Sequence, residues 1–142
     1  MGGSIYSDNS VASFTDALEQ RIRSTRQNAR RNYFSAYTCY GIAIAASLLA
    51  TLAAATEFLP KAALAVLTAI PGTALLVNSV FSFENKSNWY WRKARRYDGI
   101  LMSVRFEALE LSSASKDLRV YDEKMEAEYP KFGMIPQKRD NL

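Results

Sequence analysis

A long, nearly uncharged block in the middle of the chain constrains the fold more than any other feature. From Asn32 to Phe83 the only charged residues are Glu57 and Lys61, and they divide the block into two apolar halves. A helix of about 20 residues rises about 30 Å, which is the thickness of the hydrocarbon core of a bilayer. The sequence therefore predicts two transmembrane helices, at residues 37–59 and 62–83, joined by a tight turn.

A soluble bundle with two buried helices is the alternative to this interpretation. A helix at the surface of a soluble protein normally has a polar face, and neither apolar half offers one. We therefore predict an all-α membrane protein built on a two-span transmembrane helical hairpin. An N-terminal amphipathic helix precedes the hairpin and a long C-terminal cytoplasmic helix follows it. The whole chain, residues 1–142, is predicted to form a single domain.

Basic residues bracket the apolar block on both sides. Five arginines fall between Arg21 and Arg31, and five further cations fall between Lys86 and Arg96. Because cationic flanks of spanning helices stay in the cytoplasm, both termini are predicted to be cytoplasmic and the turn to lie outside. Aromatic residues cluster beside the cations, as they do at a headgroup layer. The predicted membrane-interface anchors are Arg30, Arg31, Trp89, Trp91, Arg92, Lys93, Arg95 and Arg96.

The segment before the first span is predicted to form a helix over residues 10–32. Residues 1–9 are expected to be loosely held, and Ser13 with Asp16 resembles a capping box that would start the helix. Apolar residues recur at helical spacing on one face, while acidic and basic residues occupy the other. This helix either packs on its neighbours, which its narrow apolar stripe favours, or lies on anionic headgroups.

A second flanking helix is predicted over residues 89–128, followed by an irregular tail at 129–142. Apolar residues at alternating spacings of four and three form a seam typical of a helix that pairs with another. The partner is either the N-terminal helix or the same helix of another subunit. The seam residues are Tyr97, Leu101, Val104, Ala108 and Leu111.

The residues that most catalytic and metal sites require are missing from the sequence. Histidine is absent and Cys39 is the only cysteine, which excludes zinc sites built from these residues. No glycine-rich phosphate loop and no nucleophile elbow is present. We therefore expect no enzyme activity and no cofactor, and a membrane-bound enzyme subunit is disfavoured. Nucleic acid is not an expected partner, because the cations bracket the apolar block instead of covering one face.

Small and polar residues inside the spans are the remaining candidates for function. Small residues at a spacing of four let helix backbones approach closely, and hydroxyls can bond across such a contact. The predicted helix-packing residues are Gly41, Ala45, Ala46, Ala50 and Ala54. The predicted pore or inter-subunit residues are Ser47, Thr51, Thr68, Gly72, Asn78 and Ser79.

Two interpretations of these polar residues stay open. They either serve only helix packing, or they line a lumen between several hairpins. A single hairpin has too little surface to enclose a pore, so conduction requires a homo-oligomer in the lipid bilayer. Pro71-Gly72 is expected to weaken or kink the second span.

The layout resembles the SLATT family, two-transmembrane effectors associated with SMODS nucleotidyltransferases and SLOG sensors in bacterial conflict systems. The likeness rests on residues 88–98, Asn-Trp-Tyr-Trp-Arg-Lys-Ala-Arg-Arg-Tyr-Asp, and on Glu126, Tyr129, Pro130, Phe132 and Gly133. It implies an oligomeric effector of anti-phage defence that breaches the bacterial inner membrane when an upstream nucleotide-signalling or sensor partner is triggered. The alternative function is a non-conducting membrane adaptor that presents a cytoplasmic helical platform to partner proteins.

Overall fold

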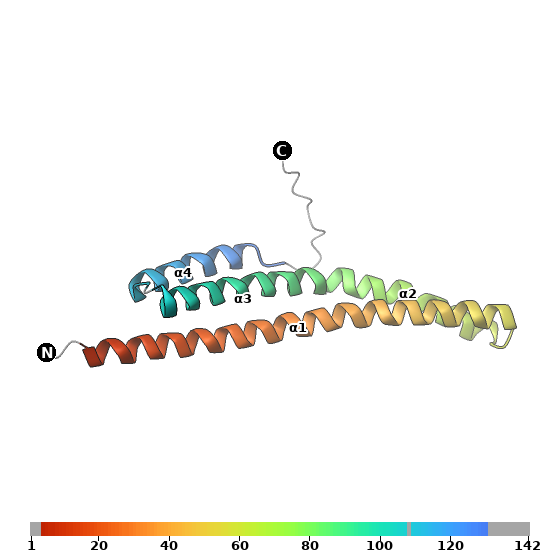
Figure 1. Ribbon diagram of the computed structural model, residues 1–142. Coiled ribbons are helices and arrows are strands. Elements are labelled where there is room, and N and C mark those ends of the chain that lie inside the picture. Colours follow the sequence, from red (N-terminus) through yellow and green to blue (C-terminus); the bar gives the residue numbers. More distant parts are fainter. Residues whose placement is uncertain (1–3, 108, 131–142) are drawn as a thin grey trace. The chain divides into compact units, whose positions relative to one another are not determined.

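The computed structural model describes residues 4–107 and 109–130, and these residues form helices joined by short connections, without a strand. In chain order the elements are α1 (Ser4–Thr56), α2 (Lys61–Phe81), α3 (Phe83–Phe106) and α4 (Leu111–Ala127), as Figure 1 shows. The chain divides into two compact units. The described part of the first unit comprises residues 4–30, 86–107 and 109–129, and that of the second comprises residues 31–85 and Pro130.

Helix α1 is longer than the sequence patterns predict. It begins at Ser4 and continues to Thr56, so the expected start near residue 10 and the expected break between residues 32 and 37 are both wrong. The physical reason is that no glycine or proline occurs between Ser4 and Tyr40, so nothing interrupts the ladder of backbone hydrogen bonds. Ser13 consequently lies inside the helix and not at its N-cap.

The connection between α1 and α2 is the short turn expected around residues 57–61. Glu57 has a φ of 52°, the left-handed conformation that commonly ends a helix. Pro60 is extended and precedes the first residue of α2, and its carbonyl accepts the amide of Leu64 at 3.1 Å. The turn reverses the direction of the chain within the second unit (Figure 1). Helix α2 then continues through Pro71 without a break.

The two apolar segments are long and apolar enough to cross a membrane. Only 17% of the most apolar window in α1 is buried, and only 6% of the corresponding window after the turn. The core helix of a soluble protein passes the same length and composition test, but it is mostly buried. The exposure of both segments therefore favours association with a membrane.

The predicted helix over residues 89–128 is two helices. The first, α3, begins at Phe83, directly after Ser82, whose φ of 52° ends α2. It ends where the amides of Glu107 and Leu109 both bond to the carbonyl of Ser103 at 3.1 Å. No glycine or proline occurs at this break. The chain breaks here because folding α4 back onto the bundle buries apolar residues that a straight helix would leave exposed. Ala108 and residues 131–142, including Phe132 and Gly133, lie outside the described residues.

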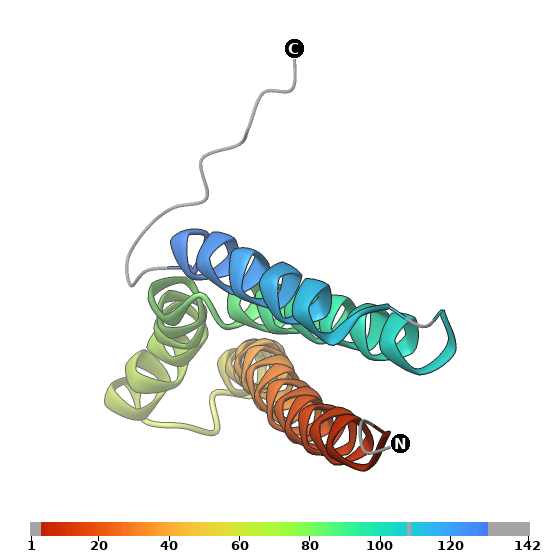
Figure 2. The ribbon, with the colours of Figure 1, turned by 90° about the vertical axis from the view of Figure 1, so that its left-hand side faces the viewer.

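The core of the first unit joins residues from three helices. Helices α3 and α4 lie side by side, as Figures 1 and 2 show, and α1 contributes its first seven turns to the same core. The buried cluster contains Leu18, Ile22, Tyr97, Ile100, Leu101 and Ala114, with Val104 and Leu118 packed against it. The predicted seam on α3 therefore packs against the N-terminal part of α1, the first of the two partners considered. Leu111 is half-buried at the start of α4.

Candidate functional site

A row of buried alanines lines one face of α1 in the second unit. Ala36, Ala43, Ala46 and Ala50 are each no more than 7% exposed. Their spacings of seven, three and four follow the heptad repeat of helices that pack nearly parallel or antiparallel. Cys39 and Ala53 are half-buried positions of the same row.

This alanine row corrects part of the predicted packing face. Ala46 and Ala50 are buried as expected, but Gly41, Ala45 and Ala54 are exposed. The reason is geometric, since residues four apart drift around the helix while a heptad pattern stays on one face. A Cβ placed on Gly41 or Gly72 would meet no atom within 4 Å, so neither glycine serves a close approach among the described residues.

Asn78 is the only residue of α2 that is buried. The residue is 9% exposed, and its Oδ1 atom has no hydrogen-bond partner among the described residues. Leu64, Leu67, Pro71 and Ala74 precede it at heptad spacing and are half-buried. A single asparagine in such a seam lowers stability and selects register or partner. The apolar packing of α2 is therefore interrupted at Asn78 by one buried amide oxygen without a partner.

The other predicted pore or inter-subunit residues are exposed, namely Ser47, Thr51, Thr68, Gly72 and Ser79. The Thr51 hydroxyl donates to the Ser47 carbonyl at 2.9 Å, and the Thr68 hydroxyl donates to the Ala65 carbonyl at 2.9 Å. Because each of these donors is satisfied by its own helix, the hydroxyl costs little in an apolar environment. Its remaining lone pairs stay available to water or to another chain.

These exposed residues lie on one side of the α1–α2 pair. Successive helical residues are about 100° apart, so Ser47 and Thr51 lie roughly a quarter turn beyond the buried row of α1. Thr68 and Ser79 lie roughly a quarter turn beyond the row of α2 that holds Asn78. The rotation has the same sense on both helices. Since both helices are right-handed and run in opposite directions, equal rotations from their common contact bring both sets to the same side.

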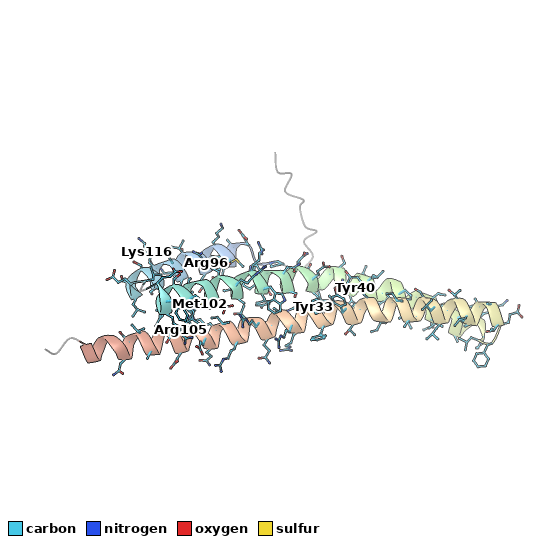
Figure 3. The ribbon with its side chains drawn as sticks, viewed as in Figure 1. Tyr33, Tyr40, Arg96, Met102, Arg105 and Lys116 are labelled. Carbon is cyan, nitrogen blue, oxygen red and sulfur yellow. The ribbon has the colours of Figure 1, made fainter. Side chains whose placement is uncertain are left out.

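Aromatic side chains surround the end of the pair where α1 enters the apolar block. Tyr33, Phe34 and Tyr37 are exposed on α1, and Figure 3 labels Tyr33 and Tyr40 on this helix. The Tyr40 hydroxyl donates to Glu84 Oε2 at 3.3 Å, which joins α1 to the beginning of α3 within the second unit. The aromatic residues that the sequence places before the first apolar segment are therefore exposed on the surface of α1.

Two of the predicted membrane anchors have a different role. Trp89 is 5% exposed, and its indole N–H donates to the Met125 carbonyl at 2.8 Å. Lys93 pairs with Asp122 at 3.1 Å and lies 5.0 Å from the centroid of the Trp89 ring. Both side chains stabilise the bundle instead of contacting headgroups, because folding α4 back covers them. Trp91 is half-buried, and the exposed anchors are Arg30, Arg31, Arg92, Arg95 and Arg96.

Asp122 on α4 is a functional candidate that the sequence reasoning missed. Its carboxylate accepts the Tyr97 hydroxyl and pairs with Lys93 at 3.1 Å and Arg21 at 3.4 Å, so it joins all three helices of the first unit. Burial raises the pKa of Tyr97, and the hydrogen bond to Asp122 raises it further. The signal in the sequence was the loss of the apolar seam at Asp122, which places a carboxylate on the packed face.

No family model, curated protein or solved structure matches this chain. Among residues 9–107 and 109–130, no three histidine, cysteine, aspartate or glutamate side chains are placed to hold a metal ion. The candidate functional residues are therefore identified from geometry alone, in the α1–α2 pair of the second unit and, separately, in the helical bundle of the first unit.

Proposed function

We propose that the chain crosses a membrane twice as a helical hairpin, and that several copies assemble with their polar sides facing a common lumen. The assembly then acts as a pore-forming or membrane-disrupting effector. Both termini face the cytoplasm, because the cationic flanks lie on that side of the hairpin and the connection at residues 57–61 carries only one cation, Lys61, beside Glu57.

The observation that carries this proposal is the shared polar side of the two spans. Ser47, Thr51, Thr68 and Ser79 are exposed on one side of the pair, and the remaining exposed surface is mainly apolar apart from threonines such as Thr56 and Thr73. A hairpin that served only as an anchor would gain nothing from placing four hydroxyls on one side. In an assembly, the same arrangement gives each copy a polar wall, and hydroxyls with free lone pairs can hold water.

The resemblance to SLATT effectors supports the biological setting of the proposal. In that setting the membrane is the bacterial inner membrane, and an upstream nucleotide-signalling or sensor protein triggers the assembly as part of anti-phage defence. The bundle of the first unit supplies the surface on which such a partner acts.

Dye uptake by bacteria that express the chain with its neighbouring genes tests the proposal. Wild type is expected to admit a membrane-impermeant dye after triggering, and the double variant Thr51→Val and Thr68→Val is expected to reduce the uptake several-fold. Thr73→Val is the matched control, because Thr73 lies about 140° around α2 from Thr68. Its hydroxyl also donates to its own helix, at 3.0 Å to the Ala69 carbonyl. The proposal fails if wild type at high level never depolarises the membrane.

A non-conducting adaptor is the second candidate, and the packing of the first unit favours it. The bundle has its own buried core and a network around Asp122, so it can present a fixed surface at the membrane. If the chain is an adaptor, Thr51→Val with Thr68→Val leaves function intact. Substitution of Leu101 by Asp, which disrupts the bundle core, then abolishes function without any change in membrane insertion.

A further inference from the structure

The arginines of α1 fall into two groups according to their partners. Three of them each lie against a carboxylate of the first unit: Arg21 with Asp122, Arg23 with Glu19 and Arg26 with Asp98. Arg30 and Arg31 are also exposed, but neither has an ion-pair partner among the described residues. The positive charge of α1 is therefore neutralised away from the apolar block and left free at its edge.

Exposed aromatic rings follow these two arginines immediately. Tyr33 and Tyr37 lie with ring centroids 4.3 Å apart, and Tyr33 and Phe34 lie 5.9 Å apart. Their exposed fractions are 45%, 67% and 58% for Tyr33, Phe34 and Tyr37. Residues 30, 33, 34 and 37 have the spacing that places side chains on one face of a helix. Arg30 thus stands one turn before an exposed aromatic surface.

The distances along α1 match the layers of a bilayer leaflet. Seven residues separate Arg30 from Tyr37, a rise of about 10 Å, which is enough to cross an interfacial layer of roughly 5–8 Å. Twenty residues separate Tyr37 from Glu57, a rise of about 30 Å that equals the hydrocarbon thickness. When the aromatic rings lie at the glycerol level, the guanidinium groups lie at the phosphates.

We propose that Arg30 and Arg31 bind the phosphodiester of an anionic phospholipid in the cytoplasmic leaflet, with Tyr33, Phe34 and Tyr37 against its glycerol and upper acyl chains. This inference rests on the proposed membrane insertion and names the lipid class that the hairpin selects. Guanidinium groups bind phosphate through paired hydrogen bonds. A zwitterionic lipid carries a positive charge of its own, so the charge of the two arginines stays uncompensated. An anionic headgroup neutralises that charge.

Native mass spectrometry of the full chain in detergent tests the proposal. The protein is mixed with equal amounts of phosphatidylglycerol and phosphatidylcholine, and the ratio of retained lipids is measured. Wild type is expected to retain phosphatidylglycerol in preference, and Arg30→Gln with Arg31→Gln is expected to lower the ratio by about fivefold per arginine. Lysine at both positions is expected to keep most of the preference, because it keeps the charge.

Arg23→Gln is the matched control, since Arg23 is an exposed arginine of the same helix that is paired with Glu19 at 3.3 Å. The proposal is overturned if wild type retains both lipids equally, or if Arg23→Gln lowers the ratio as much as the double variant. It is also overturned if free glycerol phosphate displaces the bound lipid, because the site then recognises phosphate alone. Failure to insert into liposomes at all would instead contradict the proposed function.

Discussion

At the scale of single residues, Asp122 connects the three helices of the bundle through its polar contacts. One partly exposed carboxylate serves Tyr97, Lys93 and Arg21 on two other helices. Asp122→Asn removes the charge and leaves the part-buried Tyr97 hydroxyl and the Lys93 ammonium group poorly satisfied, which we expect to cost about 1–3 kcal/mol of unfolding free energy. Chemical unfolding followed by circular dichroism measures it. Asp117→Asn on the exposed face of α4 is the control, and equal effects of the two variants would contradict the role of Asp122.

The raised pKa of Tyr97 gives the bundle a dependence on alkaline pH. Burial and the Asp122 hydrogen bond favour the protonated phenol in the folded state, so the stability they contribute is complete below the ordinary tyrosine pKa of 10. That contribution declines as the pH rises above 10, because the unfolded chain then ionises first. Unfolding midpoints between pH 8 and 11 should fall less steeply for Tyr97→Phe. Some slope remains, since burial also raises the pKa of Tyr90 and Tyr121. Identical slopes for wild type and variant would contradict this assignment.

Asn78 gives a residue-scale prediction of the opposite sign. Replacing this amide by leucine removes a buried oxygen without a partner and adds apolar contact with α1, so Asn78→Leu should stabilise the helix pair by about 1–3 kcal/mol. Thermal unfolding in detergent measures the change, and Ser79→Ala on the neighbouring exposed position should have little effect. A loss of stability in Asn78→Leu would contradict the assignment of Oδ1 as a buried oxygen without a partner.

At the scale of elements, substitutions in the alanine row of α1 and on its exposed face distinguish packing within one chain from assembly of several chains. Ala46→Leu places a larger side chain in the buried row and should destabilise the pair by about 1–3 kcal/mol through overpacking. Ala45→Leu makes the same change on the exposed face, so it should leave the unfolding midpoint unchanged. Size-exclusion chromatography with light scattering then shows whether either variant changes the oligomeric state. If both variants destabilise the pair equally, the assignment of the buried row is wrong.

The helix boundaries show which elements could be predicted from the sequence. The turn near Glu57 was predictable because two charges and Pro60 interrupt an apolar run. The continuity of α1 was not, because the change from amphipathic to apolar at Tyr37 alters the environment of the helix without breaking its backbone hydrogen bonds. The break before Leu111 was also hidden, since tertiary packing of α4 and not a local breaker produces it.

At the scale of the whole molecule, the apolar composition predicted two helices long enough to cross a membrane, and the structure contains two helices that are long and apolar enough to do so. The candidate site was only partly predictable. Ser47 and Thr51 are exposed because the buried alanines of α1 follow a heptad spacing. The predicted packing face followed a spacing of four and therefore did not identify this buried row. The role of Trp89 and Lys93 required the position of α4, which no local pattern in the sequence specifies.

The topology of the hairpin in the membrane is the central claim, and cysteine accessibility in intact bacteria tests it most directly. In a Cys39→Ser background, single cysteines replace Phe58 in the exposed turn and Ser115 on the exposed face of α4. We predict that a membrane-impermeant maleimide labels Phe58→Cys in intact cells, and that it labels Ser115→Cys only after the membrane is permeabilised. Equal labelling of both cysteines in intact cells, or release of the protein into the soluble fraction without detergent, would contradict the two-span topology.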